Sequence, residues 1–266
     1  MFHQVAHGQR IVIKIGSSLL VDHETGLIRR EWLTSLLNEI IFYWQQGKEM
    51  IIVSSGAIAL GRRHLQLGDR AALTLPQKQA AAAVGQIKLA HAYQEALYAQ
   101  GITVAQVLLT LDDSQNAERF ANAKNTLKTL LELQAIPVIN ENDTVATAEI
   151  RFGDNDRLAA CVAHMIEADT LVLLSDIDGF YTANPQVDQT AVLIREVREL
   201  TPEMMAMAGD SATEYGSGGM ITKLAAAKMA MESGCRMVIA AGKHMSPLRR
   251  IDTSEDNTWF IPGRAF

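Results

Sequence analysis

The sequence predicts an α/β protein whose central sheet is mostly parallel and is covered by helices on both faces. Short apolar runs of strand length alternate with longer segments of helical periodicity, and polar residues gather directly after the apolar runs. This alternation is typical of parallel sheets, because each crossover between parallel strands needs a helix. With 266 residues, of which 48% are hydrophobic, the chain can bury a large core as one domain or two closely joined halves.

The first elements illustrate the pattern. Arg10–Ile15 reads RIVIKI, which is typical of a buried strand, and Gly16–Ser18 forms a tight turn after it. From about Arg30–Gln46, tryptophan, leucine and isoleucine recur at helical spacing and form one apolar face. Gly47 ends this helix, and Met50–Ser54 is the next strand.

The same alternation continues to the end of the chain. Further predicted strands are Thr103–Leu109, Ile136–Asn140, Thr170–Ser175 and Arg236–Ala240. Further predicted helices are Ala57–Leu65, Pro76–Gln100, Ala117–Gln134, Asp156–Glu167 and Thr222–Ser233. The polar segment Leu111–Phe120 is predicted to be a surface loop.

Composition excludes several classes of protein. The net charge of −6 and the dispersed basic residues argue against nucleic acid or an anionic membrane as the main partner. Cys161 and Cys235 stand alone, so we expect no disulfide framework, and the histidines show no metal-ligand spacing. The N-terminus lacks the apolar segment of a signal peptide, and no apolar run is long enough to span a membrane. These features predict a soluble cytoplasmic protein.

The segment Gly216–Lys223, reading GSGGMITK, combines three glycines with a lysine at a predicted helix start. Glycines let successive backbone N–H groups converge on an anion, and a helix N-terminus adds partial positive charge. The segment is not a P-loop, because Thr222 precedes Lys223 instead of following it. The alternative is a flexible loop without a ligand. We interpret the segment as a phosphate site with Lys223 beside it.

Lys14 is the second candidate for an anion site, because it lies inside the apolar strand Arg10–Ile15. Burying a lysine is unfavourable unless an anion pairs with it. Gly16 follows it and allows a ligand to approach the backbone closely. The alternative is a lysine whose head reaches solvent from an edge strand.

Polar residues follow several of the predicted strands. Ligands of parallel sheets bind beyond the carboxyl ends of the strands, so these residues are expected to form one site. The clusters are Lys14–Gly16, Ser54–Ala57, Asn140–Asp143 and Ser175–Asp176, with Gly153–Asp156 directly before a helix. Taken singly, Asp154 or Asn155 also suits a helix N-cap.

A resemblance to the amino-acid kinase family is carried, in the expected order, by VIKIGSS, VSSGAIALG, PVINENDTVAT, FGDNDRLAA, LLSDIDGFYTANP and GSGGMITKLAAA. NENDTV, GDND and GGMITK are most similar to the members that phosphorylate L-glutamate with ATP, giving L-glutamyl 5-phosphate in the first step of proline biosynthesis. The resemblance implies a three-layer αβα sandwich. It also implies that about 1–168 binds the amino acid and about 169–266 binds the nucleotide.

This reaction joins two anions. Two like charges about 4 Å apart repel by roughly 4 kcal/mol at an effective dielectric near 20. Fixed positive charge therefore matters more than a base, since a carboxylate is already deprotonated. We assign Lys14 and Lys223 to the phosphates, and Asp156 to orienting both lysines. The alternative for Asp156 is an acid in the first turn that complements the helix dipole.

The resemblance implies a substrate set of Ser55, Asp143 and Asn155. An acid suits the α-ammonium group of glutamate, and an amide suits an ammonium or a carboxylate according to its orientation. For Ser55, capping of the strand end is the alternative. Backbone N–H groups of Gly16 and Gly56 are expected to contact the moving phosphoryl group. The implied ATP-binding residues are Lys14, Ser175, Asp176, Ser217, Gly218, Gly219, Met220, Ile221, Thr222 and Lys223.

The resemblance also implies Mg²⁺ delivered with ATP, a homo-oligomer (dimer or tetramer) and feedback inhibition by proline. Many glutamate-phosphorylating members carry a C-terminal PUA domain, whereas this sequence ends at Phe266, so we expect a single kinase domain over 1–266. One alternative is a sister kinase acting on N-acetylglutamate or aspartate. Another is a nucleotide-binding regulatory protein without turnover, against which the two lysines and Asp156 argue.

Overall fold

The protein is built around an eight-stranded sheet with the strand order β3-β4-β2-β1-β5-β9-β10-β8. The computed structural model describes residues 3–68, 72–145, 155–209 and 219–263. The sheet strands are β1 (Arg10–Ile15), β2 (Glu49–Ser54), β3 (Val104–Leu109), β4 (Ile136–Glu141), β5 (Thr170–Ser175), β8 (Glu196–Val197), β9 (Arg236–Ala241) and β10 (Asn257–Phe260). In this spatial order, each pair of neighbouring strands from β3 to β9 is parallel, and β10 runs antiparallel to β9.

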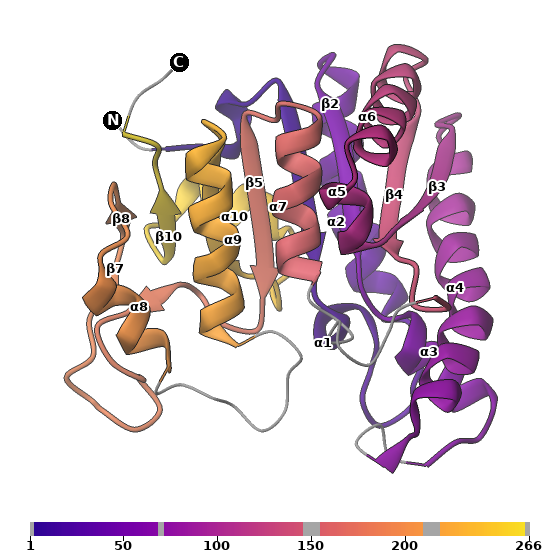
Figure 1. Ribbon diagram of the computed structural model, residues 1–266, viewed down its shortest axis with the longest axis horizontal. Coiled ribbons are helices and arrows are strands. Elements are labelled where there is room, and N and C mark those ends of the chain that lie inside the picture. Colours follow the sequence, from indigo (N-terminus) through magenta and orange to yellow (C-terminus); the bar gives the residue numbers. More distant parts are fainter. Residues whose placement is uncertain (1–2, 69–71, 146–154, 210–218, 264–266) are drawn as a thin grey trace.

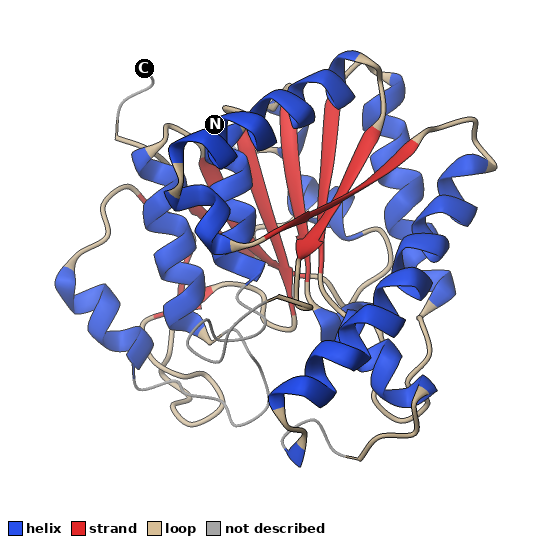
Figure 2. Ribbon diagram, turned by 45° about the vertical axis from the view of Figure 1, so that its right-hand side comes forward, coloured by secondary structure: helices blue, strands red, loops and turns tan. Residues whose placement is uncertain are grey.

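Helices cover both faces of this sheet, as Figures 1 and 2 show. They are η1 (Val5–His7), α1 (Ser17–Leu20), α2 (Arg30–Gln45), α3 (Ala57–His64), α4 (Leu75–Tyr98), α5 (Leu111–Gln115), α6 (Ala117–Glu132), α7 (Asn155–Met165), α8 (Pro202–Gly209), α9 (Met220–Glu232) and α10 (Pro247–Thr253). A separate hairpin pairs β6 (Phe180–Tyr181) with β7 (Leu193–Ile194). The predicted sandwich with a mostly parallel sheet is confirmed. None of the described helices is both long and apolar enough to cross a bilayer.

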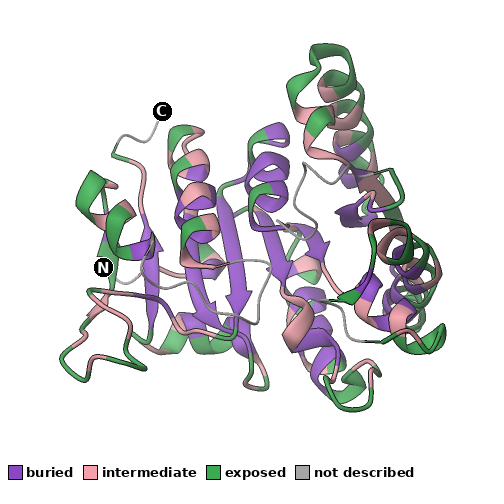
Figure 3. Cartoon of the chain, turned by 60° about the horizontal axis from the view of Figure 1, so that its bottom comes forward, coloured by how far each residue is buried: buried purple, intermediate pink, exposed green. Residues whose placement is uncertain are grey.

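Two apolar cores lie on opposite faces of the sheet, because successive side chains of a strand alternate between faces. Ile13 and Ile15 of β1 pack with α2, α4 and α10, whereas Val12 packs with α6, α7 and α9. Figure 3 shows the central strands almost entirely buried between helices whose outer surfaces face solvent. Lys14 is two positions after Val12 in β1, so its side chain lies on the same face of the sheet, the side of α7 and α9.

Helices α3 and α4 cross unusually closely. A Cβ atom added at Gly61 would lie 1.7 Å from the carbonyl oxygen of Ala81, and one at Gly85 would lie 1.7 Å from that of Ala57. Only glycine fits at such a crossing, because any side chain would displace the backbone. The crossing fixes the middle of α4 against the start of α3, next to the carboxyl end of β2.

Two sequence predictions are wrong in detail. Leu111–Phe120 is not a loop: it forms α5 and the start of α6. Its polar residues act as caps, since Asn116 accepts hydrogen bonds from the backbone N–H groups of Glu118 and Arg119. The turn predicted at Gly16–Ser18 continues into the one-turn helix α1. The short elements β8, α10 and β10 are too brief to leave a periodic signal.

Candidate active site

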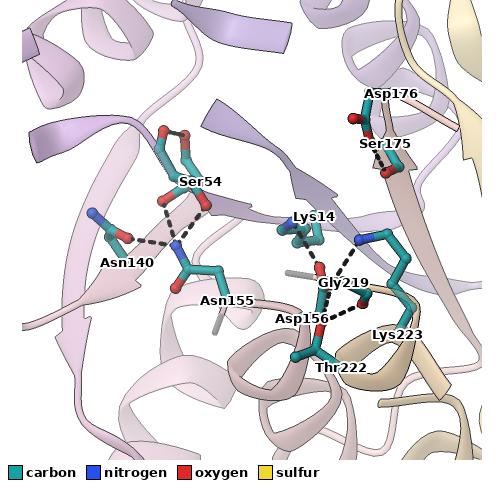
Figure 4. Close-up of polar contacts among 11 residues, drawn as sticks. Lys14, Ser54, Asn140, Asn155, Asp156, Ser175, Asp176, Gly219, Thr222 and Lys223 are labelled. Atoms are coloured by element: carbon teal, nitrogen blue, oxygen red, sulfur yellow. Dashed lines mark hydrogen bonds and ion pairs between the residues drawn. The ribbon is translucent and has the colours of Figure 1, made fainter. Parts of the chain in front are cut away.

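Two lysines from distant parts of the chain meet at one carboxylate. Lys14 Nζ in β1 lies 2.6 Å from Asp156 Oδ1, and Lys223 Nζ in α9 lies 3.1 Å from Asp156 Oδ2. The exposed fractions of these side chains are 11%, 5% and 2% for Lys14, Lys223 and Asp156. Figure 4 shows both ammonium groups directed at the carboxylate. The structure therefore brings Lys14, Asp156 and Lys223 together, as the predicted role of Asp156 requires.

The local fold explains this meeting. Asp156 is in the first turn of α7, and Lys223 is in the first turn of α9. Both helices pack on the face of β1 toward which Lys14 points. The Thr222 hydroxyl lies 2.8 Å from the Gly219 carbonyl oxygen and 3.2 Å from Asp156 Oδ2, which ties the start of α9 to the same carboxylate.

Electrostatics keeps Asp156 ionised. Burial raises its pKa, but the positive charges of Lys14 and Lys223 outweigh burial and bring the pKa down to about 2. Two buried cations share one carboxylate in a nearly dry site. Such a site suits an anionic ligand, because nearby ammonium groups offset the cost of removing the charge of the ligand from water.

Asn155, the residue before Asp156, belongs to a second, uncharged cluster. Its Nδ2 donates to Ser55 Oγ at 2.7 Å and to Asn140 Oδ1 at 3.0 Å. Asn140 Nδ2 donates in turn to Gln86 Oε1 of α4 at 2.8 Å. In Figure 4 the Asn155 side chain points toward Asn140 and Ser54, away from the two lysines. Adjacent residues at the start of α7 therefore serve two different clusters.

A small pocket opens beside the uncharged cluster. Its lining includes Ser55, Gly56, Asn140, Glu141, Asp143 and Asn155. Glu141 and Asp143 are 6% and 8% exposed, so the wall carries two nearly buried acidic side chains. Buried carboxylates favour a cationic group on a ligand. The structure thus places the three residues predicted to contact substrate around one cavity.

Gly56 shapes the mouth of this pocket. It begins α3 with φ of 115°, in the left-handed region that glycine tolerates and other residues rarely adopt. Gly16, at the end of β1, leaves room near Lys14, since a Cβ there would lie 3.9 Å from Lys14 Nζ. Both glycines lie at the carboxyl edge of the sheet, between the lysines and the pocket strands.

Apart from Lys14, the described residues that were predicted to contact nucleotide lie on the other side of β1. In the sheet order, β2 and β4 lie on one side of β1, and β5 and β9 lie on the other. Ser175 ends β5, and its hydroxyl donates to Asp176 Oδ1 at 2.9 Å. Gly219 precedes α9, and Met220, Ile221 and Thr222 form its first turn with Lys223. Ser217 and Gly218, together with Gly153 and Asp154 of the GDND motif, lie outside the described residues.

Sequence reasoning missed one contributor to the site, Gln86. Asn140 and Glu141 belong to the polar cluster predicted at the end of a strand, but no individual role was predicted for them. Gln86 lies inside a long helix that also carries Gln77, Gln79 and Gln94, and nothing in the pattern separates it from them.

The sequence matches those of known proteins along most of its length. The model of the amino acid kinase family matches residues 9–241. Glutamate 5-kinase of Paramagnetospirillum magneticum is 60% identical over 97% of this chain and 69% of its own length. Glutamate 5-kinase of Rhodospirillum rubrum is 57% identical over 94% of this chain and 67% of its own length.

Solved structures resemble the chain in fold. Carbamate kinase from Giardia lamblia bound to AMP-PNP superposes with a TM-score of 0.67 at 15% identity, covering 97% of this chain and 99% of that one. UMP kinase from Bacillus anthracis gives a TM-score of 0.65 at 15% identity, covering 97% of both chains.

Proposed function

The chain belongs to the amino acid kinase family, and from this premise we propose that it is an ATP-dependent kinase of the side-chain carboxylate of L-glutamate. A carboxylate oxygen of glutamate forms a bond to the γ-phosphorus of ATP, and the bond from that phosphorus to the bridging oxygen of ADP breaks. The products are L-glutamyl 5-phosphate and ADP, so the enzyme acts in the first step of proline biosynthesis. No proton needs to move, because the carboxylate is ionised at neutral pH.

The observation that carries this proposal is the pair of buried lysines on one carboxylate, next to an acidic pocket. Lys14 and Lys223 supply fixed positive charge where two anionic reactants must approach. Asp156 holds both ammonium groups in place, and its pKa of about 2 keeps it ionised during turnover. Phosphoryl transfer depends mainly on positioning and electrostatics, which this arrangement supplies.

The pocket holds the amino acid. Asp143 pairs with the α-ammonium group of glutamate, and Ser55 and Asn155 contact the same substrate. Asn155 Nδ2 is engaged by protein partners, so its Oδ1 is the atom left for substrate, and this oxygen accepts from an ammonium group. Backbone N–H groups of Gly16 and Gly56 face the phosphoryl group in transit.

The nucleotide binds on the β5 side of β1. Ser175 and Asp176 contact it there, and the segment from Ser217 to Lys223 holds its phosphates at the start of α9. We assign the amino acid to about 1–168 and the nucleotide to about 169–266. Mg²⁺ arrives with ATP and neutralises part of its phosphate charge.

A hydroxylamine assay tests the proposal, because hydroxylamine converts acyl phosphates to coloured hydroxamates. The protein is incubated with ATP, Mg²⁺ and one acid at a time: L-glutamate, N-acetyl-L-glutamate or L-aspartate. We expect signal with L-glutamate. Signal only with N-acetylglutamate or only with aspartate would show that this acid, and not L-glutamate, is the substrate. No signal with any of the three acids would overturn the proposed kinase activity. We also propose feedback inhibition by proline, which is tested by adding L-proline to this assay. We further propose that the protein is a dimer or tetramer, which is tested by analytical sedimentation.

A further inference from the structure

Gln86 is connected to the substrate pocket although it lies on α4 and is absent from the described lining of that pocket. Its Oε1 accepts from Asn140 Nδ2 at 2.8 Å, and Asn140 Oδ1 accepts from Asn155 Nδ2 at 3.0 Å. Three amides, from α4, β4 and α7, thus form one chain of hydrogen bonds. The last amide of the chain, Asn155, lines the pocket.

A chain of amides has a direction. Each amide has one acceptor end and one donor end, so the orientation of one fixes that of the next. Asn155 Nδ2 faces the backbone carbonyl oxygen of Ser54 at 3.5 Å, which can only accept. Asn140 therefore presents Oδ1 to Asn155, its Nδ2 points away from the pocket, and Gln86 Oε1 supplies the acceptor that this Nδ2 needs.

The two free ends of this chain are informative. Asn155 Oδ1 and Gln86 Nε2 are both buried, and neither has a hydrogen-bond partner among the described residues. For Asn155 the missing partner is a donor in the pocket. Gln86 does not line the pocket, and a buried donor without a partner normally destabilises a protein. Methionine has a similar length without that donor, so packing alone does not explain a glutamine here.

We propose that Gln86 is a positioning residue that sets substrate selectivity through the orientation of Asn140 and Asn155. Without its acceptor, the Asn140 amide is free to turn and present Nδ2 to Asn155. Among the described residues the Asn155 amide is otherwise held by the Ser54 carbonyl oxygen, at the long distance of 3.5 Å, and by the Ser55 hydroxyl, which can donate as well as accept. The Asn155 amide then turns as well, and its NH₂ group faces the pocket in place of its oxygen. A donor at that place repels the α-ammonium group of glutamate but tolerates an acid that lacks this group.

This inference rests on the proposed function, and Gln86→Met tests it. We expect the KM for L-glutamate to rise about tenfold, while kcat and the KM for ATP change less than twofold. Glutarate, which has the same carboxylates without the ammonium group, serves as a competitive inhibitor. Its Ki should stay unchanged or fall. General damage to the pocket would raise the glutamate KM and the glutarate Ki together.

Two further variants complete the test. Gln86→Glu keeps an acceptor toward Asn140 and should retain the wild-type ratio of glutamate KM to glutarate Ki. Gln94→Met makes the same substitution at an exposed position of α4 and should match the wild type in every constant.

The outcomes are separable. A wild type that makes hydroxamate from glutamate, together with a Gln86→Met variant whose glutamate KM is unchanged, overturns the positioning role alone. Parallel increases in KM and Ki overturn it as well, since they assign Gln86 to packing. A wild type that makes no hydroxamate from glutamate overturns the proposed substrate, and with it the ammonium group on which this selectivity depends.

Discussion

Two neighbouring clusters at the start of α7 are held together by different forces. Asp156 joins Lys14 and Lys223 through ion pairs in a nearly dry site, whereas Asn155 joins Ser55 and Asn140 through neutral hydrogen bonds. Ion pairs depend on charge and tolerate changes of angle, but amide hydrogen bonds depend on which end of the amide faces which partner. The charged cluster therefore suits catalysis on phosphates, and the neutral one suits discrimination between substrates.

One helix start positions both clusters. Because successive residues of a helix are about 100° apart, Asn155 and Asp156 project in different directions from the same turn. Asp156 faces β1 and α9, while Asn155 faces the ends of β2 and β4. Any motion of this turn would shift both clusters together, which links the amino acid to the phosphates that it must reach.

The charged cluster should dominate the rate. We expect Lys223→Ala to lower kcat by about 10³-fold or more, because one well-placed cation at a phosphoryl transfer contributes about that much. The KM for glutamate should change little, since Lys223 is on the opposite side of Asp156 from the pocket. Steady-state kinetics with both substrates varied will measure this. An unchanged kcat would remove Lys223 from the mechanism.

The charged cluster should also respond more strongly than the neutral one when a partner is lost. Asp156→Asn removes the carboxylate that two buried ammonium groups share and should destabilise the protein by about 3–5 kcal/mol. Ser55→Ala removes one neutral hydrogen bond and should cost about 1 kcal/mol. Urea unfolding of both variants measures the difference. Equal losses would show that the two clusters are not energetically distinct.

The contrast also explains what could be predicted from sequence. A lysine within the apolar run RIVIKI is unfavourable unless an anion pairs with it, so Lys14 could be selected as a candidate site residue, and Lys223 could be selected from its glycine-rich setting. The mostly parallel sheet follows from the alternation of runs, and that prediction is confirmed. Gln86 gives no such signal, because a glutamine suits any helix surface and only the packing of α4 beside β4 makes this one different.

The acidic pocket should control the affinity for glutamate and not the rate of phosphoryl transfer. Asp143→Asn removes a nearly buried negative charge that we assign to the substrate ammonium group, so the KM for glutamate should rise about 30-fold, or about 2 kcal/mol. The kcat should fall much less, because the lysine cluster is intact. Asp112→Asn, a loss of charge at an exposed position of α5, is the control. An unaltered KM in Asp143→Asn would exclude Asp143 from substrate binding.

The smallest expected effect is the acid sensitivity of the charged cluster. The pKa of Asp156 falls from an ordinary value of 3.8 to about 2 on folding, so the native state binds this proton more weakly than the unfolded chain does. The ionised Asp156 carboxylate contributes about 2 kcal/mol to the free energy of unfolding. This contribution is complete above pH 4 and is lost as the pH falls toward 2. Unfolding free energies measured between pH 5 and pH 2.5 should therefore fall less steeply for Asp156→Asn than for the wild type.

Asp188→Asn is the exposed control. Hydrogen bonds from Thr190 lower the pKa of Asp188, but solvent screens the charge of this carboxylate. The dependence of unfolding free energy on pH in Asp188→Asn should therefore stay close to that of the wild type. Parallel profiles for Asp156→Asn and the wild type would mean that the lysines do not hold this carboxylate ionised.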